Sequence, residues 1–409
     1  MCLVENFHSW IEGLKAKPLE EKETQLAVVV PTADEKAIVQ RAIMNWSQEL
    51  NANIVRTHPK NSVCFSPLSI MIVLGMILRG LPEGAAKQQI IEKICLNDLS
   101  ESHIQAALGE ICRELCADDH LKISISNALA VAPEVKVKDS FKEAMKTLYD
   151  SEIFQPGPHA VEEINQWVSQ HTQGMIPKIL SSEIDLSDLM TCLINAIYFK
   201  GEWKEPFKKE NSFKQEFTCI DGSKAEKLML HQFQRHLFLK KDDFKMLEKS
   251  FLSNDPTKSL SFVVFLPKDP NGLPELEKRL DANFVSGCRA VACKEKVSLT
   301  LPKMEINFKL EDLKEHLENM GLPVGEEIVN LADRAQVTNI IHQSKLRIDE
   351  KGAEGAAATV AVVREMMMCP TILEPEEFDA RHPFAFFVMA GDEVLFQGSI
   401  KDASALLDQ

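Results

Sequence analysis

The chain has 409 residues, of which 45% are hydrophobic and 26% charged, the balance of an ordinary globular protein. A chain this long buries roughly three quarters of its unfolded surface and needs neither disulfides nor a metal to fold. The net charge of −15 repels phosphate backbones and anionic lipid, and the longest apolar run, Ile70 to Leu78, falls far short of the ~20 residues that span a bilayer. We therefore expect neither nucleic acid nor membrane as a partner.

The N-terminal residues predict an extension, residues 1–31, that is mobile or loosely docked. Glu5, His8 and Glu12 interrupt its apolar residues, which is unlike a secretory signal peptide. Without an export signal, the ten cysteines, which are spread along the chain, are expected to be reduced thiols. We expect the protein to be cytoplasmic or exported without a signal peptide, and extracellular action stays open.

A single folded domain is expected over residues 32–409. Thr32, followed three residues later by Glu35, has the pattern of a helix capping box. The apolar stripe behind it predicts a long helix and comprises Ile38, Ala42, Ile43, Trp46 and Leu50. A second apolar stretch has Pro67 near its start, where a helix tolerates proline.

The remaining elements place helices mainly in the first half of the chain and strands in the second. Leu121, Ile123 and Ile125 alternate as in a strand. The other predictions are helices at 141–149, from 164 to near Gly174, and at 309–320, and strands at 260–266, 297–301, 345–348, 384–388 and 394–396. This order, without regular βαβ alternation, predicts an α+β fold with a mostly antiparallel or mixed sheet.

The sequence gives no positive sign of catalysis. It has no G-x-S-x-G, G-x-x-x-x-G-K, G-x-G-x-x-G or H-E-x-x-H motif. Cys112, Cys116 and His120 are spaced four apart and would share a helix face, but a fourth metal ligand is missing, so we interpret the cysteines as ordinary thiols. Cys288 and Cys293 are interpreted in the same way. We expect no enzyme, no metal and no cofactor.

The most informative segment is Gly352 to Ala361, in which nearly every side chain is very small. Alternate positions would share one face of a strand, and they are Ala353, Gly355, Ala357, Thr359, Ala361 and Val363. Small residues on one face suit a strand that slips between two others above a filled core. The plainer interpretation is a flexible or helical surface loop.

This segment resembles the hinge of inhibitory serpins, the serine protease inhibitors. Ala353 stands where that family usually has Thr or Ser, and Gly355 where it has Ala, but both are small. Four further blocks resemble the family in the same order and bring the resemblance to about residues 35–405. They are Asn61–Ile70, Asn195–Trp203, Ile164–Val168 with Thr172–Gly174, and Phe378–Phe384, the last with Arg381 where Asp or Asn is common.

The resemblance implies the serpin fold, in which a helix-rich N-terminal half packs on a large central mixed sheet, with smaller sheets and an exposed reactive loop at about 350–382. It assigns the hinge of that loop to Glu350, Gly352, Ala353, Glu354, Gly355, Ala356, Ala357, Ala358 and Thr359. It places a polar cluster beneath the central strands at Ser66, Ser69, Asn195 and His342, and Trp203 where the loop enters the sheet. Alternatively, His342 is a satisfied strand-end histidine and Trp203 a core aromatic residue.

The resemblance also implies a mechanism. A serine protease cuts the loop, forms an acyl-enzyme and is trapped when the loop inserts into the sheet. The usual distance from Glu350 places the cut bond at Met366–Met367, with Arg364 or Met368 as alternatives. Methionine suits a chymotrypsin-, elastase- or subtilisin-like target, whereas Arg364 would indicate a trypsin-like one.

For partners, we expect a monomer that forms a covalent complex with a serine protease. Glycosaminoglycan activation is not expected, because residues 92–120 are strongly acidic. Their charged residues are Glu92, Asp98, Glu101, Glu110, Glu114, Asp118 and Asp119 against Lys93 and Arg113. Two rival interpretations stay open: a non-inhibitory serpin, such as a chaperone or carrier, and an unrelated enzyme or scaffold that happens to have an Ala-rich loop.

Overall fold

The computed structural model describes residues 29–116, 121–155, 159–181, 190–253, 259–352 and 375–409. The helices are α2 (Ala33–Thr57), α3 (Pro67–Gly80), α4 (Ala85–Lys93), α5 (Glu101–Cys116), α6 (Asp139–Tyr149), α7 (Ala160–His171), α8 (Leu273–Glu277), α9 (Ala282–Val291) and α10 (Leu313–Asn319), with a 3-10 turn at Lys209–Asn211. The strands are β1 (Val63–Phe65), β2 (Leu121–Val131), β3 (Glu152–Phe154), β4 (Thr191–Gly201), β5 (Phe213–Thr218), β6 (Lys224–Lys240), β7 (Phe244–Ser250), β8 (Leu260–Pro267), β9 (Cys293–Pro302), β10 (Met304–Leu310), β11 (Asn339–Ile348), β12 (Glu376–Asp379), β13 (Phe384–Ala390) and β14 (Glu393–Ile400).

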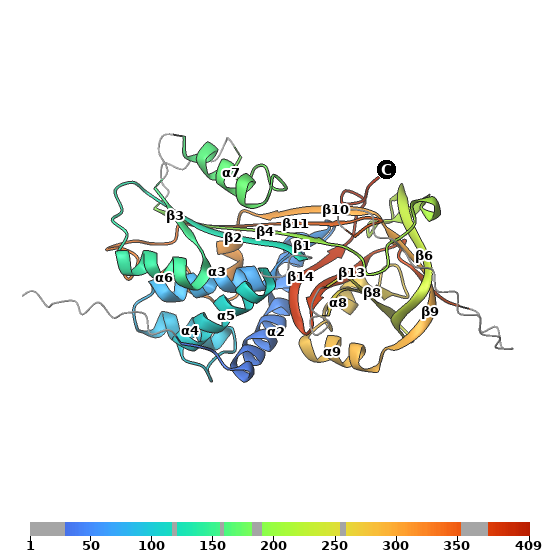
Figure 1. Ribbon diagram of the computed structural model, residues 1–409, viewed down its shortest axis with the longest axis horizontal. Helices are drawn as coiled ribbons and strands as arrows, with labels where there is room; N and C mark the ends of the chain where they lie inside the picture. Colours follow the sequence, from blue (N-terminus) through green and yellow to red (C-terminus); the bar gives the residue numbers. More distant parts are fainter. Residues whose placement is uncertain (1–28, 117–120, 156–158, 182–189, 254–258, 353–374) are drawn as a thin grey trace, which may run out of the picture.

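A mixed five-stranded sheet runs across the molecule in the order β10-β11-β4-β2-β3 (Figure 1). Its long central pairing is antiparallel and joins β2 to β4 over eleven residues, from Leu121 opposite Gly201 to Val131 opposite Thr191. β4 and β11 are neighbours but run parallel to each other. Parallel strands pair slightly less stably than antiparallel ones, so the boundary between β4 and β11 is the weaker seam within the long central strands.

The other strands form one nine-stranded sheet in the order β1-β14-β13-β8-β7-β6-β9-β12, with β5 beside β6. β12 pairs in parallel with β9, which places Phe378 opposite Leu299. This pairing corrects the predicted extent of the exposed loop, because residues 376–379 of the expected range 350–382 are a strand in this sheet. Phe378 is fully buried and fixes that strand.

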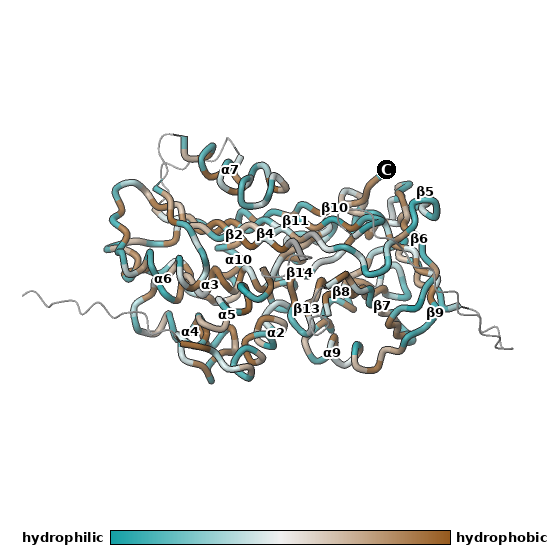
Figure 2. The backbone as a smooth tube through the Cα atoms, in the orientation of Figure 1, coloured by the Kyte–Doolittle hydropathy of each residue, from teal (hydrophilic) through white to brown (hydrophobic). Residues whose placement is uncertain are grey.

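The helices cover the two faces of the five-stranded sheet unequally (Figure 1). α3, α5 and α6 lie on one face, and α7 lies on the other. Apolar residues line both contacts (Figure 2): Ile123 and Leu129 face the main core, while Ala128 and Ala130 pack with Trp167 of α7. The part of the sheet around β2 and β4 is therefore buried on both faces.

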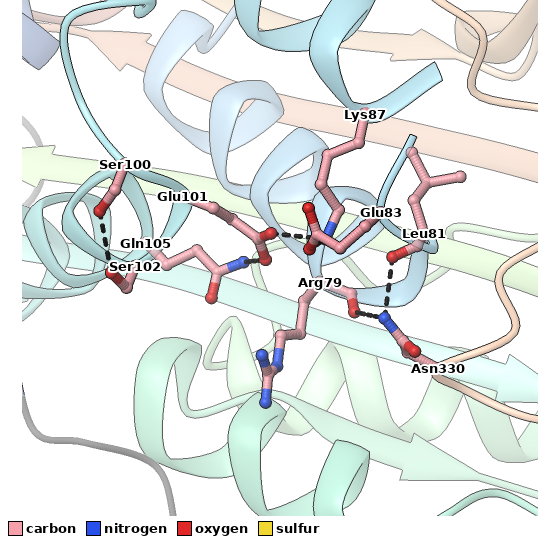
Figure 3. A network of polar contacts seen from close by, with 9 residues as sticks. All are labelled: Arg79, Leu81, Glu83, Lys87, Ser100, Glu101, Ser102, Gln105 and Asn330. Atoms are coloured by element: carbon pink, nitrogen blue, oxygen red, sulfur yellow. Dashed lines mark hydrogen bonds and ion pairs between the residues drawn. The ribbon is translucent and has the colours of Figure 1, made fainter. Parts of the chain in front are cut away.

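A polar network fixes the helical layer near the end of α3 (Figure 3). The ammonium group of Lys87, a residue only 5% exposed, pairs with Glu83 at 2.8 Å and with Glu101 at 2.5 Å, and so joins α4 to α5. Asn330 donates from Nδ2 to the carbonyl oxygens of Arg79 and Leu81 at the end of α3. α3 is thereby held at its C-terminus, and its N-terminus lies beneath the seam between β4 and β11.

Most predicted elements are confirmed, including the capping box. The Thr32 side chain accepts from the Glu35 backbone N–H, and the Glu35 carboxylate accepts from the Thr32 N–H. The helix predicted at 309–320 was wrong at its start, because β10 continues through Leu310 and α10 begins at Leu313. The helix predicted from Ile164 begins earlier, at Ala160, and ends at His171.

Candidate functional site

The end of the seam between β4 and β11 is closed by Gly352. A tight turn after β11 joins Asp349 and Gly352 by two backbone hydrogen bonds, of 3.0 and 3.3 Å. Gly352 forms antiparallel bridges with both Asp349 and Glu202, the residue after β4. After the turn, the chain therefore lies between the ends of β4 and β11. It runs antiparallel to both strands, as a new strand inserted between them would.

Only glycine fits position 352. Its φ of +113° lies in a region that L side chains rarely adopt, and a Cβ would lie 2.3 Å from the Gly201 carbonyl oxygen. Its backbone hydrogen bonds to Asp349 hold that conformation. The predicted hinge residue Gly352 is thus required by close backbone packing against β4.

Trp203 holds the turn from the β4 side. Its side chain is 2% exposed, stacks on Phe251 at 4.2 Å between ring centroids, and donates from Nε1 to the Asp349 carbonyl at 2.9 Å. The Trp203 backbone N–H donates to the Lys351 carbonyl, and that of Phe207 to the Glu350 carbonyl, at 2.8 Å. The segment 203–207 therefore binds three successive carbonyl groups of residues 349–351.

The carboxylate of Glu350 is fixed by a buried ion pair. It lies 3.1 Å from the Lys303 ammonium group, and both side chains are largely shielded from water. A shielded pair loses little to salt screening, so it restrains the predicted hinge root more firmly than a surface pair would.

A fully buried polar cluster lies under the middle of the seam and is centred on Asn195 of β4. The Asn195 Oδ1 atom accepts from His342 Nδ1 of β11 at 2.5 Å and from the Ser69 hydroxyl at 2.8 Å. The Asn195 amide donates from Nδ2 to Asn127 Oδ1 of β2 at 2.7 Å. Asn127, Asn195 and His342 stand opposite one another in the sheet register, so the cluster crosses three neighbouring strands.

The first turn of α3 completes the cluster. Ser66 is the N-cap residue, and its Oγ accepts from the Ser69 backbone N–H. The Ser66 backbone N–H donates to His342 Nε2 at 3.2 Å. Nε2 is therefore the acceptor and Nδ1 carries the proton, so His342 is neutral. One helix N-terminus contacts both strands of the seam.

Burial lowers the pKa of His342 to about 3. The unfolded chain therefore binds more protons than the native protein between about pH 6.5 and pH 3, and native stability falls as the pH is lowered through that range. At pH 4.5 the loss is roughly 2–3 kcal/mol.

We expect His342→Gln to lose less stability between pH 7 and pH 4 than the wild type, because an amide offers a donor and an acceptor without titrating. The part that remains belongs to other buried histidines such as His236. Urea unfolding from pH 7 to 4 measures the effect. An unchanged slope in the variant would assign the acid sensitivity to other groups.

The structure brings together the predicted cluster residues Ser66, Ser69, Asn195 and His342, and it places Trp203 and Glu350 at the end of the same seam. The predicted hinge residues 353–359 and the cut-bond candidates Arg364, Met366, Met367 and Met368 lie outside the described residues. Asn127 was missed. It continues the apolar face of Ile123 and Ile125 with a polar side chain, and that break in the alternation is the signal that could have found it.

The candidate metal ligands at the C-terminal end of α5 are only partly within the described ranges. Cys112 and Cys116 lie on α5, whereas His120 is outside the described ranges. Within those ranges no three His, Cys, Asp or Glu side chains are grouped to hold a metal ion. The described helices include none that is both long and apolar enough to span a bilayer.

The sequence and the fold of this chain are similar to those of known proteins of one family. The sequence profile described as serpin (serine protease inhibitor) matches residues 41–403, and the chain belongs to the serpin family. It is 30% identical to the leukocyte elastase inhibitor of Xenopus tropicalis over 382 residues, which cover 87% of this chain and 97% of that protein. It is 28% identical to serine protease inhibitor 42Dd of Drosophila melanogaster over 368 residues, covering 87% of this chain and 95% of the relative.

Solved structures show the same fold. Arabidopsis AtSerpin1 in its native stressed conformation matches with a TM-score of 0.79 at 26% identity, over 91% of this chain and 99% of that one. Human thyroxine-binding globulin matches with a TM-score of 0.80, over 90% and 99% of the two chains. At 22% identity the second likeness bears on the fold alone. The predicted serpin fold is confirmed.

Proposed function

We propose that this protein is a suicide-type inhibitor of serine proteases. The protease's catalytic serine attacks the carbonyl carbon of the reactive bond, the peptide bond breaks, and the new N-terminus leaves with the C-terminal fragment. The upstream arm, still joined to the protease as an ester, inserts into the five-stranded sheet. Loop insertion of this kind is the known mechanism of inhibitory serpins. We expect a monomer that forms a one-to-one covalent complex.

The observation that carries the proposal is the seam itself. β4 and β11 are parallel neighbours, and Gly352 already bridges antiparallel to Glu202 at its end. A strand that continued from Gly352 between them would replace one parallel pairing with two antiparallel ones. Antiparallel pairing is the slightly more stable kind, so insertion is favourable in backbone terms alone.

The sequence provides enough chain for this insertion. Residues 353–366 are fourteen residues, which extend to about 46 Å as a strand, against about 36 Å for the eleven residues of β4. At ~1 kcal/mol net for each new hydrogen bond, a dozen inserted residues supply on the order of 10 kcal/mol. That is comparable to the whole stability of an ordinary domain and is enough to deform a bound enzyme.

Within this proposal the buried cluster controls opening. Separating β4 from β11 must break the His342–Asn195 hydrogen bond and the contacts that α3 makes to both strands. Hydroxyl, amide and imidazole groups can exchange partners with an incoming strand, whereas an apolar interface could not. The cluster therefore holds the seam closed until the loop is cut.

The test is a covalent complex on denaturing gels. The protein is mixed with chymotrypsin, pancreatic elastase, subtilisin and trypsin, each also supplied with its catalytic serine replaced by alanine. A band resistant to SDS and heat, formed only by active protease, is the expected result. Cleavage without a complex by every protease would instead indicate a non-inhibitory serpin.

We expect cleavage between Met366 and Met367, because an unbranched apolar side chain fits chymotrypsin-, elastase- and subtilisin-like pockets. The leukocyte elastase inhibitor relative agrees with this target class. N-terminal sequencing of the released fragment should begin at Met367. A fragment that begins at Glu365 would show cleavage after Arg364 and a trypsin-like target, and one that begins at Cys369 would show cleavage after Met368.

A further inference from the structure

A lysine without a carboxylate partner is buried directly behind Trp203. Lys249 of β7 is 1% exposed, and its Nζ donates to the Glu205 carbonyl and to Gln232 Oε1, both at 2.7 Å. The ammonium group also lies over the rings of Trp203, 5.0 Å from the centroid, and Phe207, at 4.6 Å. Within the described part of the chain, no carboxylate lies within ion-pair distance of it.

The charged groups around this lysine do not neutralise it. The Glu205 carboxylate attracts the ammonium group but belongs to an exposed residue, so water screens it. His236 of β6 is buried nearby, and burial together with Lys249 lowers its pKa to about 3, so it is neutral above pH 5. Across Trp203, Asp349 is paired with Arg347 and Glu350 with Lys303.

The aromatic rings that cover Lys249 belong to the segment that closes the seam. Trp203 and Phe207 donate their backbone N–H groups to Lys351 and Glu350, and the Trp203 indole donates to Asp349. These three hydrogen bonds hold residues 203–207 in place over Lys249, so their loss would free Trp203 and Phe207 to move away and would let water reach the ammonium group. A buried charge without a counter-ion is strongly disfavoured, so its hydration favours that separation.

We propose that Lys249 is a positioning residue that destabilises the closed end of the seam and so promotes its opening. In the closed state the ammonium group is dehydrated, and cation–π contacts and two hydrogen bonds repay only part of that cost. In the opened state the charge is hydrated. The role in inhibition rests on the proposed function, but the effect on opening does not.

The proposal has a defined pH dependence. Burial lowers the pKa of Lys249 from 10.5 to about 7. Between pH 7 and pH 10.5 the opened state therefore binds more protons than the closed state. Below about pH 7 the free-energy cost of burying the ammonium group acts in full against closure, and this cost disappears as the pH rises toward 10.5. Lys249 therefore promotes opening most strongly at and below neutral pH.

Hydrogen exchange of the Trp203 and Phe207 amides measures this opening directly. At pH 7 we expect these amides to exchange at least about tenfold more slowly in Lys249→Met than in the wild type. The ratio of the two exchange rates should fall by up to about tenfold for each pH unit between pH 7 and pH 9. Lys249→Gln, which is neutral but can still donate a hydrogen bond, should behave like Lys249→Met. Lys401→Met is the matched control, since Lys401 is equally buried but faces Glu277.

Faster exchange in Lys249→Met, restored by Lys249→Gln, would show that the hydrogen bonds stabilise the closed end and would overturn the proposal. A slowing that does not change with pH would also overturn it, because a charge must titrate. The wild type provides a further test. Its Trp203 amide should exchange more slowly relative to the Ile328 amide, a hydrogen-bonded reference amide, as the pH rises from 7 to 9. These results do not depend on inhibition, so a failure of the proposed function appears only on the protease gels.

Discussion

Ala353→Arg should convert the protein from an inhibitor into a substrate. In the proposed mechanism Ala353 would enter the seam first, because it follows Gly352, which already bridges Glu202 at the end of β4. An arginine there would place an unpaired charge inside the sheet, at a cost of several kcal/mol. Insertion should stop at its first step, and the protease should deacylate and leave before it is trapped.

Denaturing gels and thermal melting measure this change. The complex yield should fall at least about tenfold while cleavage continues, and the cleaved variant should lack the large rise in melting temperature expected from insertion. Ala353→Ser, which introduces a small residue typical of the family, is the control and should inhibit normally. An undiminished yield of complex from Ala353→Arg would show that the protein does not act by loop insertion.

Asn195→Ala should weaken the native state more than any other single change in the buried cluster. The substitution leaves the His342 N–H and Asn127 Oδ1 without their partner in a fully buried site, and it leaves the Ser69 hydroxyl only the Ser66 carbonyl as acceptor. Each unpaired group costs about 1–3 kcal/mol, so the free energy of unfolding should fall by on the order of 3 kcal/mol or more.

Urea unfolding at pH 7 measures the loss. The control is Gln88→Ala, which removes one side-chain hydrogen bond, to Glu92, from an exposed position on α4. We expect that variant to change stability by less than about 1 kcal/mol. Equal effects of the two substitutions would mean that the cluster does not hold the seam.

The sequence was sufficient for the fold family and for three residues of the buried cluster, Ser66, Ser69 and Asn195, because they lie in the blocks Asn61–Ile70 and Asn195–Trp203 that resemble the family. The same resemblance placed His342 in the cluster. The sequence was insufficient for the contacts that depend on strand register. Asn127 joins the cluster only because β2 pairs with β4 so that residues 127 and 195 stand opposite. No local pattern fixes that register.

The burial of Lys249 and the strand β6 could not be predicted from the sequence either. β7 reads Phe-Lys-Met-Leu-Glu-Lys-Ser, in which Lys249 looks like an exposed charge, yet packing of the segment 203–207 buries it. The seventeen residues of β6 alternate too irregularly to predict a strand, because its neighbours change along its length from β5 to β7. Tertiary contacts decide both cases.

The distance along the chain between β1 and β14 sets the order in which this protein can fold. Val63 pairs with Ser399, and Ser62 bonds to Asp402, 340 residues away. All strands of the five-stranded sheet precede residue 349, so during synthesis that sheet can assemble while the last strand is still inside the ribosome. Contacts of such separation form slowly. We therefore expect the pairing of β14 with β1 to be a late step of folding, which can follow only after the five-stranded sheet has formed.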